Sequence, residues 1–96
     1  MNDWFSSLAA RWVKAGSGRG AKISPPDLDP AVAEELLQLA RVVAHQKERS
    51  YAPLASFTAG VAVERLRSAN ALGEPAEVAA YIREVREALE REQPAG

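Results

Sequence analysis

Three basic side chains stand four positions apart in the middle of this 96-residue chain: Arg41, His45 and Arg49. Residues four apart lie on the same side of a helix, so these side chains would form one ridge along a continuous helix. Two guanidinium groups and an imidazole can bind a phosphate or a carboxylate, because arginine binds such groups bidentately and histidine gains charge near neutral pH. The following residues Tyr51 and Pro53 complete this hypothetical anion-binding surface.

The same residues have a simpler interpretation as a solvated polar helix face. Glu34 and Glu48 are near enough in sequence to pair with the arginines. The carbonyl end of a helix also repels anions. Ion pairs on exposed helix faces are common and contribute little to stability, which makes this the more frequent case. Both interpretations stay open on the sequence alone.

Catalytic and metal chemistry have little support. The chain has no cysteine and a single histidine, which excludes thiolate catalysis and sulfur-bound zinc. His45 lacks an evident acidic partner that would orient it as a general base toward Ser50 or Tyr51. The glycine-rich run before Lys22 does not match a phosphate-binding loop, since no glycine directly precedes this lysine. We expect a protein that is not an enzyme and has no catalytic residue, metal or cofactor.

Helical periodicity and helix-breaking residues divide the chain into four predicted helices. Apolar residues recur at helical spacing and no segment alternates as a strand does. Prolines stand near three of the expected starts, where a missing N–H costs nothing. The expected helices cover about residues 3–14, 30–48, 53–68 and 75–92. We predict an all-α fold, a compact four-helix bundle forming a single domain over residues 1–96: an amphipathic helix (1–15), a Gly-rich linker (16–29) and a three-helix core (30–92).

The first predicted helix has an aromatic face made of Trp4, Phe5, Leu8 and Trp12. This face is a predicted interface that docks on its own bundle or on a second copy of the chain. The long linker would also permit the helix to be exchanged between two copies. Membrane binding is the less favoured alternative, because the helix lacks a strongly basic face.

The third predicted helix has the widest apolar arc, which includes Leu54, Phe57 and Leu66. A helix with so little polar surface is usually the central one of a bundle. Glycine inside a helix costs about 1 kcal/mol relative to alanine. We therefore expect Gly60 to allow close approach of a neighbouring helix.

Charge is balanced overall but uneven along the chain. Twelve basic and 13 acidic residues leave a net charge of −1, which does not indicate a nucleic-acid-binding protein. A helix-turn-helix interpretation also fails, because the helix after the turn carries only Arg65 and Arg67 near its end. Residues 1–26 have four basic residues and one acidic residue, a net of +3, whereas residues 74–96 have six glutamates and three arginines, a net of −3.

Neighbouring carboxylates and the chain ends add further expectations. Glu34 with Glu35, and Glu84 with Glu87, are interpreted as charged helix faces and not as acid–base pairs. No segment resembles a signal peptide or a membrane span, so we expect a cytoplasmic protein without membrane contact.

The segment from Leu36 to Val63 resembles a small, uncharacterised, mainly actinobacterial helical domain that is associated with molybdopterin-guanine dinucleotide biosynthesis and MobA-like proteins. The residues that carry the resemblance are Leu39-Ala40-Arg41, Ala44-His45, Arg49, Ala52-Pro53-Leu54, Phe57 and Gly60. The resemblance implies a setting in molybdenum-cofactor or formate dehydrogenase maturation, and no particular reaction.

Two functional hypotheses follow. The first is a non-enzymatic accessory or binding domain in that setting, which captures an anionic small molecule at Arg41, His45, Arg49, Tyr51 and Pro53. The second is a helical homodimerisation or protein-interaction module that uses the aromatic face of the first helix. In both cases we expect a protein partner or a homodimer.

Overall fold

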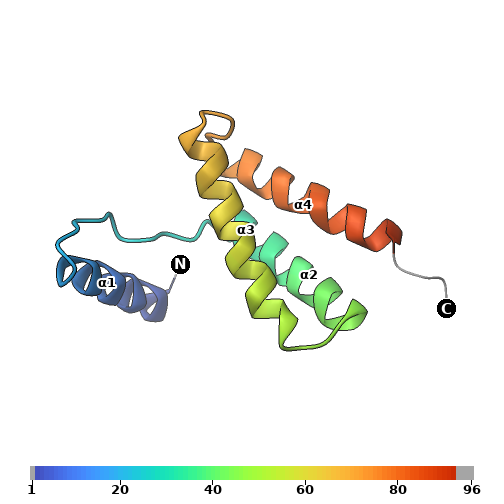
Figure 1. The fold of residues 1–96 in the computed structure, drawn as a ribbon, viewed down its shortest axis with the longest axis horizontal. Helices are drawn as coiled ribbons and strands as arrows, with labels where there is room; N and C mark the ends of the chain where they lie inside the picture. The colour runs from blue at the N-terminus through green and yellow to red at the C-terminus, as the bar shows by residue number, and fades with distance from the viewer. Residues whose placement is uncertain (1, 93–96) are drawn as a thin grey trace. The chain divides into compact units, whose positions relative to one another are not determined.

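The computed structural model describes residues 2–92, and these form four α-helices and no strand (Figure 1). The helices are α1 (Asp3–Ser17), α2 (Pro30–Gln46), α3 (Tyr51–Ser68) and α4 (Pro75–Glu92). The predicted all-α class is therefore confirmed. Along the described residues, none of the helices combines the length and the apolar character needed to cross a bilayer.

Two compact units divide the chain, with the boundary between Pro30 and Ala31. The first unit contains α1 and the segment that follows it, and the second contains the three helices α2, α3 and α4. The buried core of the second unit consists of Leu39 from α2, Val63 from α3, and Val78 and Ile82 from α4. Partly buried apolar residues pack around it: Val32, Leu36, Val43, Ala59, Leu72, Tyr81 and Leu89.

In the first unit, α1 is capped at its start by Asn2, whose Oδ1 accepts a hydrogen bond from the backbone N–H of Phe5 at 3.1 Å. The helix ends at Ser17, whereas the sequence predicted an end near Lys14. Glycine alone did not stop it. The chain turns only where the carbonyl oxygen of Gly16 accepts bonds from the backbone N–H groups of Arg19 and Ala21, at 2.9 and 3.0 Å. The predicted linker therefore begins two residues later than expected.

The connection between α2 and α3 also differs from the prediction. Helix α2 ends at Gln46 instead of residue 48, and α3 begins at Tyr51 instead of Pro53. Proline is tolerated throughout a first helical turn, because those N–H groups have no partner inside the helix. Pro53 thus marks the first turn of α3 and not its first residue. At the end of α2, Gln46 Nε2 donates to the carbonyl oxygen of Leu89 at 2.6 Å, which links α2 to α4.

Helix α3 is not the central helix that its composition predicted. Val63 is its only buried residue, and the structure describes α3 throughout. The expectation for Gly60 was also wrong, since a Cβ at this position would meet nothing within 4 Å. A wide apolar arc shows which residues share a face, but it does not show that a neighbour covers all of that face.

Candidate interaction surface

The predicted basic ridge is only partly assembled. Arg41 and His45 are exposed, one turn apart, on α2. Arg49 lies beyond the end of α2, in the turn before α3, so the three side chains do not share one helix. Arg41 Nη1 donates to Gln38 Oε1 at 3.4 Å.

The other two residues of that predicted site belong to the first turn of α3. Tyr51 and Pro53 are both exposed. Tyr51 lines a shallow hollow of about 270 Å³ together with apolar residues of α2 and α3, among them Val43 and Leu54. The tyrosine is thus placed with apolar side chains of the α2–α4 unit.

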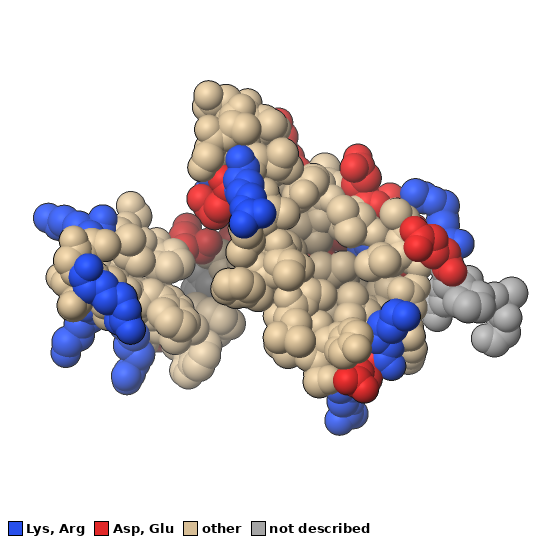
Figure 2. All heavy atoms as spheres, viewed as in Figure 1, with Lys and Arg blue, Asp and Glu red and all other residues tan. Residues whose placement is uncertain are grey.

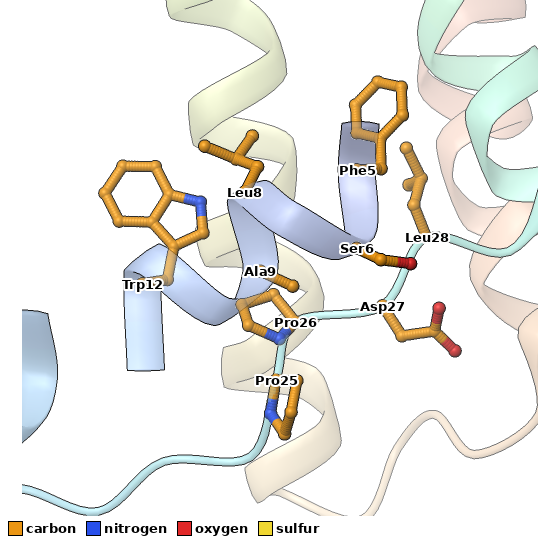
Figure 3. A pocket seen from close by; sticks show the side chains of 9 residues that line it. All are labelled: Phe5, Ser6, Leu8, Ala9, Trp12, Pro25, Pro26, Asp27 and Leu28. Atoms are coloured by element: carbon orange, nitrogen blue, oxygen red, sulfur yellow. The ribbon is translucent and has the colours of Figure 1, made fainter. Parts of the chain in front are cut away.

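The aromatic face of α1 is largely exposed. Trp4 and Trp12 are 65% and 55% exposed, and the Trp4 and Phe5 rings meet edge to face with centroids 4.9 Å apart. The other edge of this face is covered by the segment after the helix. Figure 3 shows Pro25 and Pro26 running alongside the helix at Ala9, where they line a hollow of about 510 Å³ within the first unit.

On α3, two large apolar side chains point into solvent. Leu54 is 64% exposed and Phe57 is 73% exposed. With the half-buried Val61 they follow a spacing of three and four residues, so they occupy one side of the helix. We call Leu54, Phe57 and Val61 the α3 face. Large contiguous apolar patches are a feature of protein–protein interfaces, which makes the α3 face the candidate interaction surface.

A groove of about 340 Å³ adjoins the α3 face within the α2–α4 unit. Its α3 wall is made of small residues, and its floor and α4 wall are made of larger apolar ones. The lining residues are Leu39, Val43, Ala55, Thr58, Ala59, Ala62, Tyr81, Ile82, Val85 and Leu89. Further hollows of about 600 and 270 Å³ share Thr58 and continue it toward the α3 face. In Figure 2 the surface over the lower part of α3 is largely uncharged, and charged side chains lie on the upper part of α3 and around the ends of the other helices of this unit.

A family model described as a domain of unknown function (DUF6457) matches residues 1–96. The chain belongs to the DUF6457 family. No curated protein and no solved structure was found to match it. The predicted membership of an uncharacterised family is confirmed to this extent, and the link to molybdenum-cofactor biosynthesis stays a prediction.

The strongest polar cluster of this DUF6457 domain was not predicted. Glu35 is only 8% exposed, and its carboxylate accepts hydrogen bonds from Arg83 Nε at 2.9 Å and Arg86 Nε at 3.2 Å. Arg86 also pairs with Glu90 at 3.0 Å. Burial raises the pKa of Glu35, but the hydrogen bonds and charges of the two arginines outweigh it, so the pKa lies below its ordinary value.

The geometry of the cluster suits a structural role. Glu35 is fully engaged by two guanidinium groups, and a carboxylate held ionised in this way is a poor proton acceptor. The pKa of Arg86 is raised: burial lowers it, but bonds and charges from Glu35 and Glu90 outweigh that effect. The interpretation of Glu34 and Glu35 as one charged face was therefore wrong for Glu35, which faces α4. In the sequence, the one indication that Glu35 is buried was its position next to the apolar residues of α2.

Proposed function

We propose that this domain is a non-enzymatic module that works by homodimerisation through the apolar surface of its α2–α4 unit. The observation that carries the proposal is the exposure of Leu54 and Phe57 beside an apolar groove. Burying one large apolar side chain contributes about 1.5–3 kcal/mol of favourable free energy. A partner that covers this surface can therefore gain most of its affinity from a few buried side chains.

A second copy of the same chain is the partner that this composition favours. Residues 1–26 include exposed indole rings and have a net charge of +3, while residues 74–96, which contain α4, have a net charge of −3 from six glutamates and three arginines. Surfaces with opposite charge and exposed apolar groups attract each other and then exclude water. One chain therefore carries both halves of a complementary interface.

The serine variant of Phe57 tests the proposal. Because Phe57 is 73% exposed, Phe57→Ser should leave the fold intact and weaken dimerisation about tenfold or more. The matched control is Leu37→Ser, since Leu37 is 63% exposed on α2 and does not line the groove. Sedimentation velocity over a range of chain concentrations measures both variants. Equal dimerisation of the two variants would contradict a role for the α3 face.

The setting that we propose is molybdenum-cofactor or formate dehydrogenase maturation, in which the domain acts as an accessory protein. Its support is the sequence resemblance carried by residues 36–63. An anion-binding role of Arg41, His45 and Arg49 belongs to the same proposal and is supported by the exposure of all three side chains. A rise of the thermal midpoint with GTP, GMP or phosphate that is lost in an Arg41→Ala/Arg49→Ala variant would support it. No shift with any of them would count against it.

A further inference from the structure

The groove of the α2–α4 unit is too narrow to receive a helix. Its walls run from Ala55 to Ala62 on α3 and from Tyr81 to Leu89 on α4, which is about 10 and 12 Å at 1.5 Å per residue. A volume of about 340 Å³ spread over this length corresponds to a groove about 6 Å wide. A helix with its side chains is about 10–12 Å in diameter, whereas a hydrocarbon chain is about 4 Å across. The groove therefore suits a single extended chain.

The lining of the groove is mostly apolar. It includes Leu39 and Ile82, which belong to the buried core and are only 5% and 3% exposed. Alanines line the α3 wall, and Val85 and Leu89 line the α4 wall. Ligand sites in proteins are mostly apolar clefts of about 300–1,000 Å³, in which a few polar groups fix the orientation of the ligand. The groove has the size and the lining of such a site.

One charged residue lies at an end of this groove. A hollow of about 600 Å³ shares Thr58, Ala62 and Tyr81 with the groove and continues it to Arg65. Among the described residues that line the groove and this hollow, Arg65 is the one that carries a charge. An arginine at the end of an apolar cleft is complementary to a ligand that has a carboxylate at one end of an apolar chain.

The guanidinium group of Arg65 is available to bind such a carboxylate. Arg65 is exposed, and it has no ion-pair partner in the part of the chain that the structure describes. The neighbouring Glu64 instead pairs with Arg67 at 3.3 Å, and Glu64 does not line the groove. The charge that a bound carboxylate would meet is therefore positive.

We propose that this groove binds one free long-chain carboxylate, with its hydrocarbon chain along the α3 and α4 walls and its carboxylate at Arg65. The length from Ala55 to Arg65 along α3 is about 15 Å. An extended chain advances about 1.2 Å per bond, so a chain of about 12 carbons fits this length. One copy of the chain forms the whole site, and the inference thus goes beyond the homodimer proposed above.

Calorimetric titration of the unmodified chain with carboxylates of increasing length tests the proposal. The ligands are octanoate, decanoate and dodecanoate, each below the concentration at which it forms micelles. We expect saturable binding of one molecule per chain. Each added methylene group should strengthen binding about fourfold, so each step of two carbons should give about 15-fold. 1-Decanol has the chain without the charge, and it should bind about two- to fivefold more weakly than decanoate.

Matched variants test the position of the carboxylate. Arg65→Gln should weaken the binding of decanoate about two- to fivefold and leave the binding of 1-decanol unchanged. The control is Arg91→Gln, because Arg91 is also exposed but does not line the groove, and it should change neither. Val85→Gln places a polar group in the α4 wall at a position that is 44% exposed, and it should weaken both ligands. Circular dichroism checks that each variant is folded.

Three results would overturn the inference. Uptake of many molecules per chain without saturation would show non-specific adsorption to apolar surface. Equal affinity of Arg65→Gln and Arg91→Gln for decanoate would remove the carboxylate from Arg65. Binding of the chain to vesicles of anionic phospholipid, without binding of any free carboxylate, would make this surface a membrane contact instead.

The ligand site and the homodimer fail independently. If the chain dimerises through the α3 face and binds none of the carboxylates, the homodimer stands and the ligand site does not. If decanoate binds with the expected dependence on Arg65 to a chain that stays monomeric, the ligand site stands and the homodimer does not.

Discussion

At the scale of single residues, Glu35 makes the stability of the α2–α4 unit depend on pH. Its carboxylate is buried between Arg83 and Arg86, and its pKa is lowered from an ordinary value of 4.5. When the pKa of a carboxyl group is lower in the folded chain than in the unfolded chain, the group stabilises the fold at pH values above its pKa in the unfolded chain. This contribution to stability is lost as the pH falls through the pKa of the group in the folded chain.

Replacing Glu35 by glutamine tests this role. Glu35→Gln should lower the free energy of unfolding near neutral pH by about 1–3 kcal/mol, because hydrogen bonds to a charged group are lost while both arginines remain. The difference between the variant and the unmodified chain should shrink as the pH falls from 4.5 through the lower pKa of Glu35 in the folded chain, where the unmodified chain loses its own carboxylate. Urea unfolding at several pH values measures this. A difference that stays constant down to strongly acidic pH would contradict the assignment.

The sequence could not reveal this cluster, because its members are far apart in the chain. Glu35 is separated from Arg83 by 48 positions and from Arg86 by 51. Helical spacing within α4 is enough to place Arg86 beside Glu90, one turn away, with which it pairs. Local spacing thus finds contacts within a helix, whereas contacts between helices need the fold.

At the scale of elements, helix α3 has more apolar surface than its unit can cover. All four helices were predictable from periodicity, three of them also from a proline near the start, and only the end of α1, the end of α2 and the start of α3 differ, by two or three residues. The exposure of Leu54 and Phe57 was not predictable, since periodicity identifies a face without identifying its neighbour. Uncovered surface on an otherwise regular helix is the structural basis for the proposed dimer.

Gly60 gives a prediction at this scale. Its position inside α3 is exposed and a Cβ would meet nothing within 4 Å. Gly60→Ala should therefore stabilise the chain by up to about 1 kcal/mol through helix propensity and a less flexible unfolded state.

The matched control for this variant is the reverse change at an exposed position inside α4. Ala80→Gly should destabilise the chain by a similar amount. Urea unfolding at one fixed chain concentration compares both variants with the unmodified chain. A destabilised Gly60→Ala variant would contradict the open surroundings of Gly60.

At the scale of the whole molecule, the chain consists of a unit that contains α1 and a three-helix unit, joined at Pro30. The glycine-rich composition after α1 predicted a break in the chain, although the packing of Pro25 and Pro26 along α1 was not foreseen. The two units leave complementary apolar and charged surfaces exposed, which is why we propose assembly of two copies.

The molar mass in solution tests the proposed homodimer most directly. It can be measured by multi-angle light scattering after size-exclusion chromatography, with the chain loaded from about 1 µM to about 1 mM, the range of moderate affinities between proteins. The account predicts a mass that rises with concentration toward twice the 10.3 kDa of one chain. A mass that stays at 10.3 kDa over the whole range would contradict it.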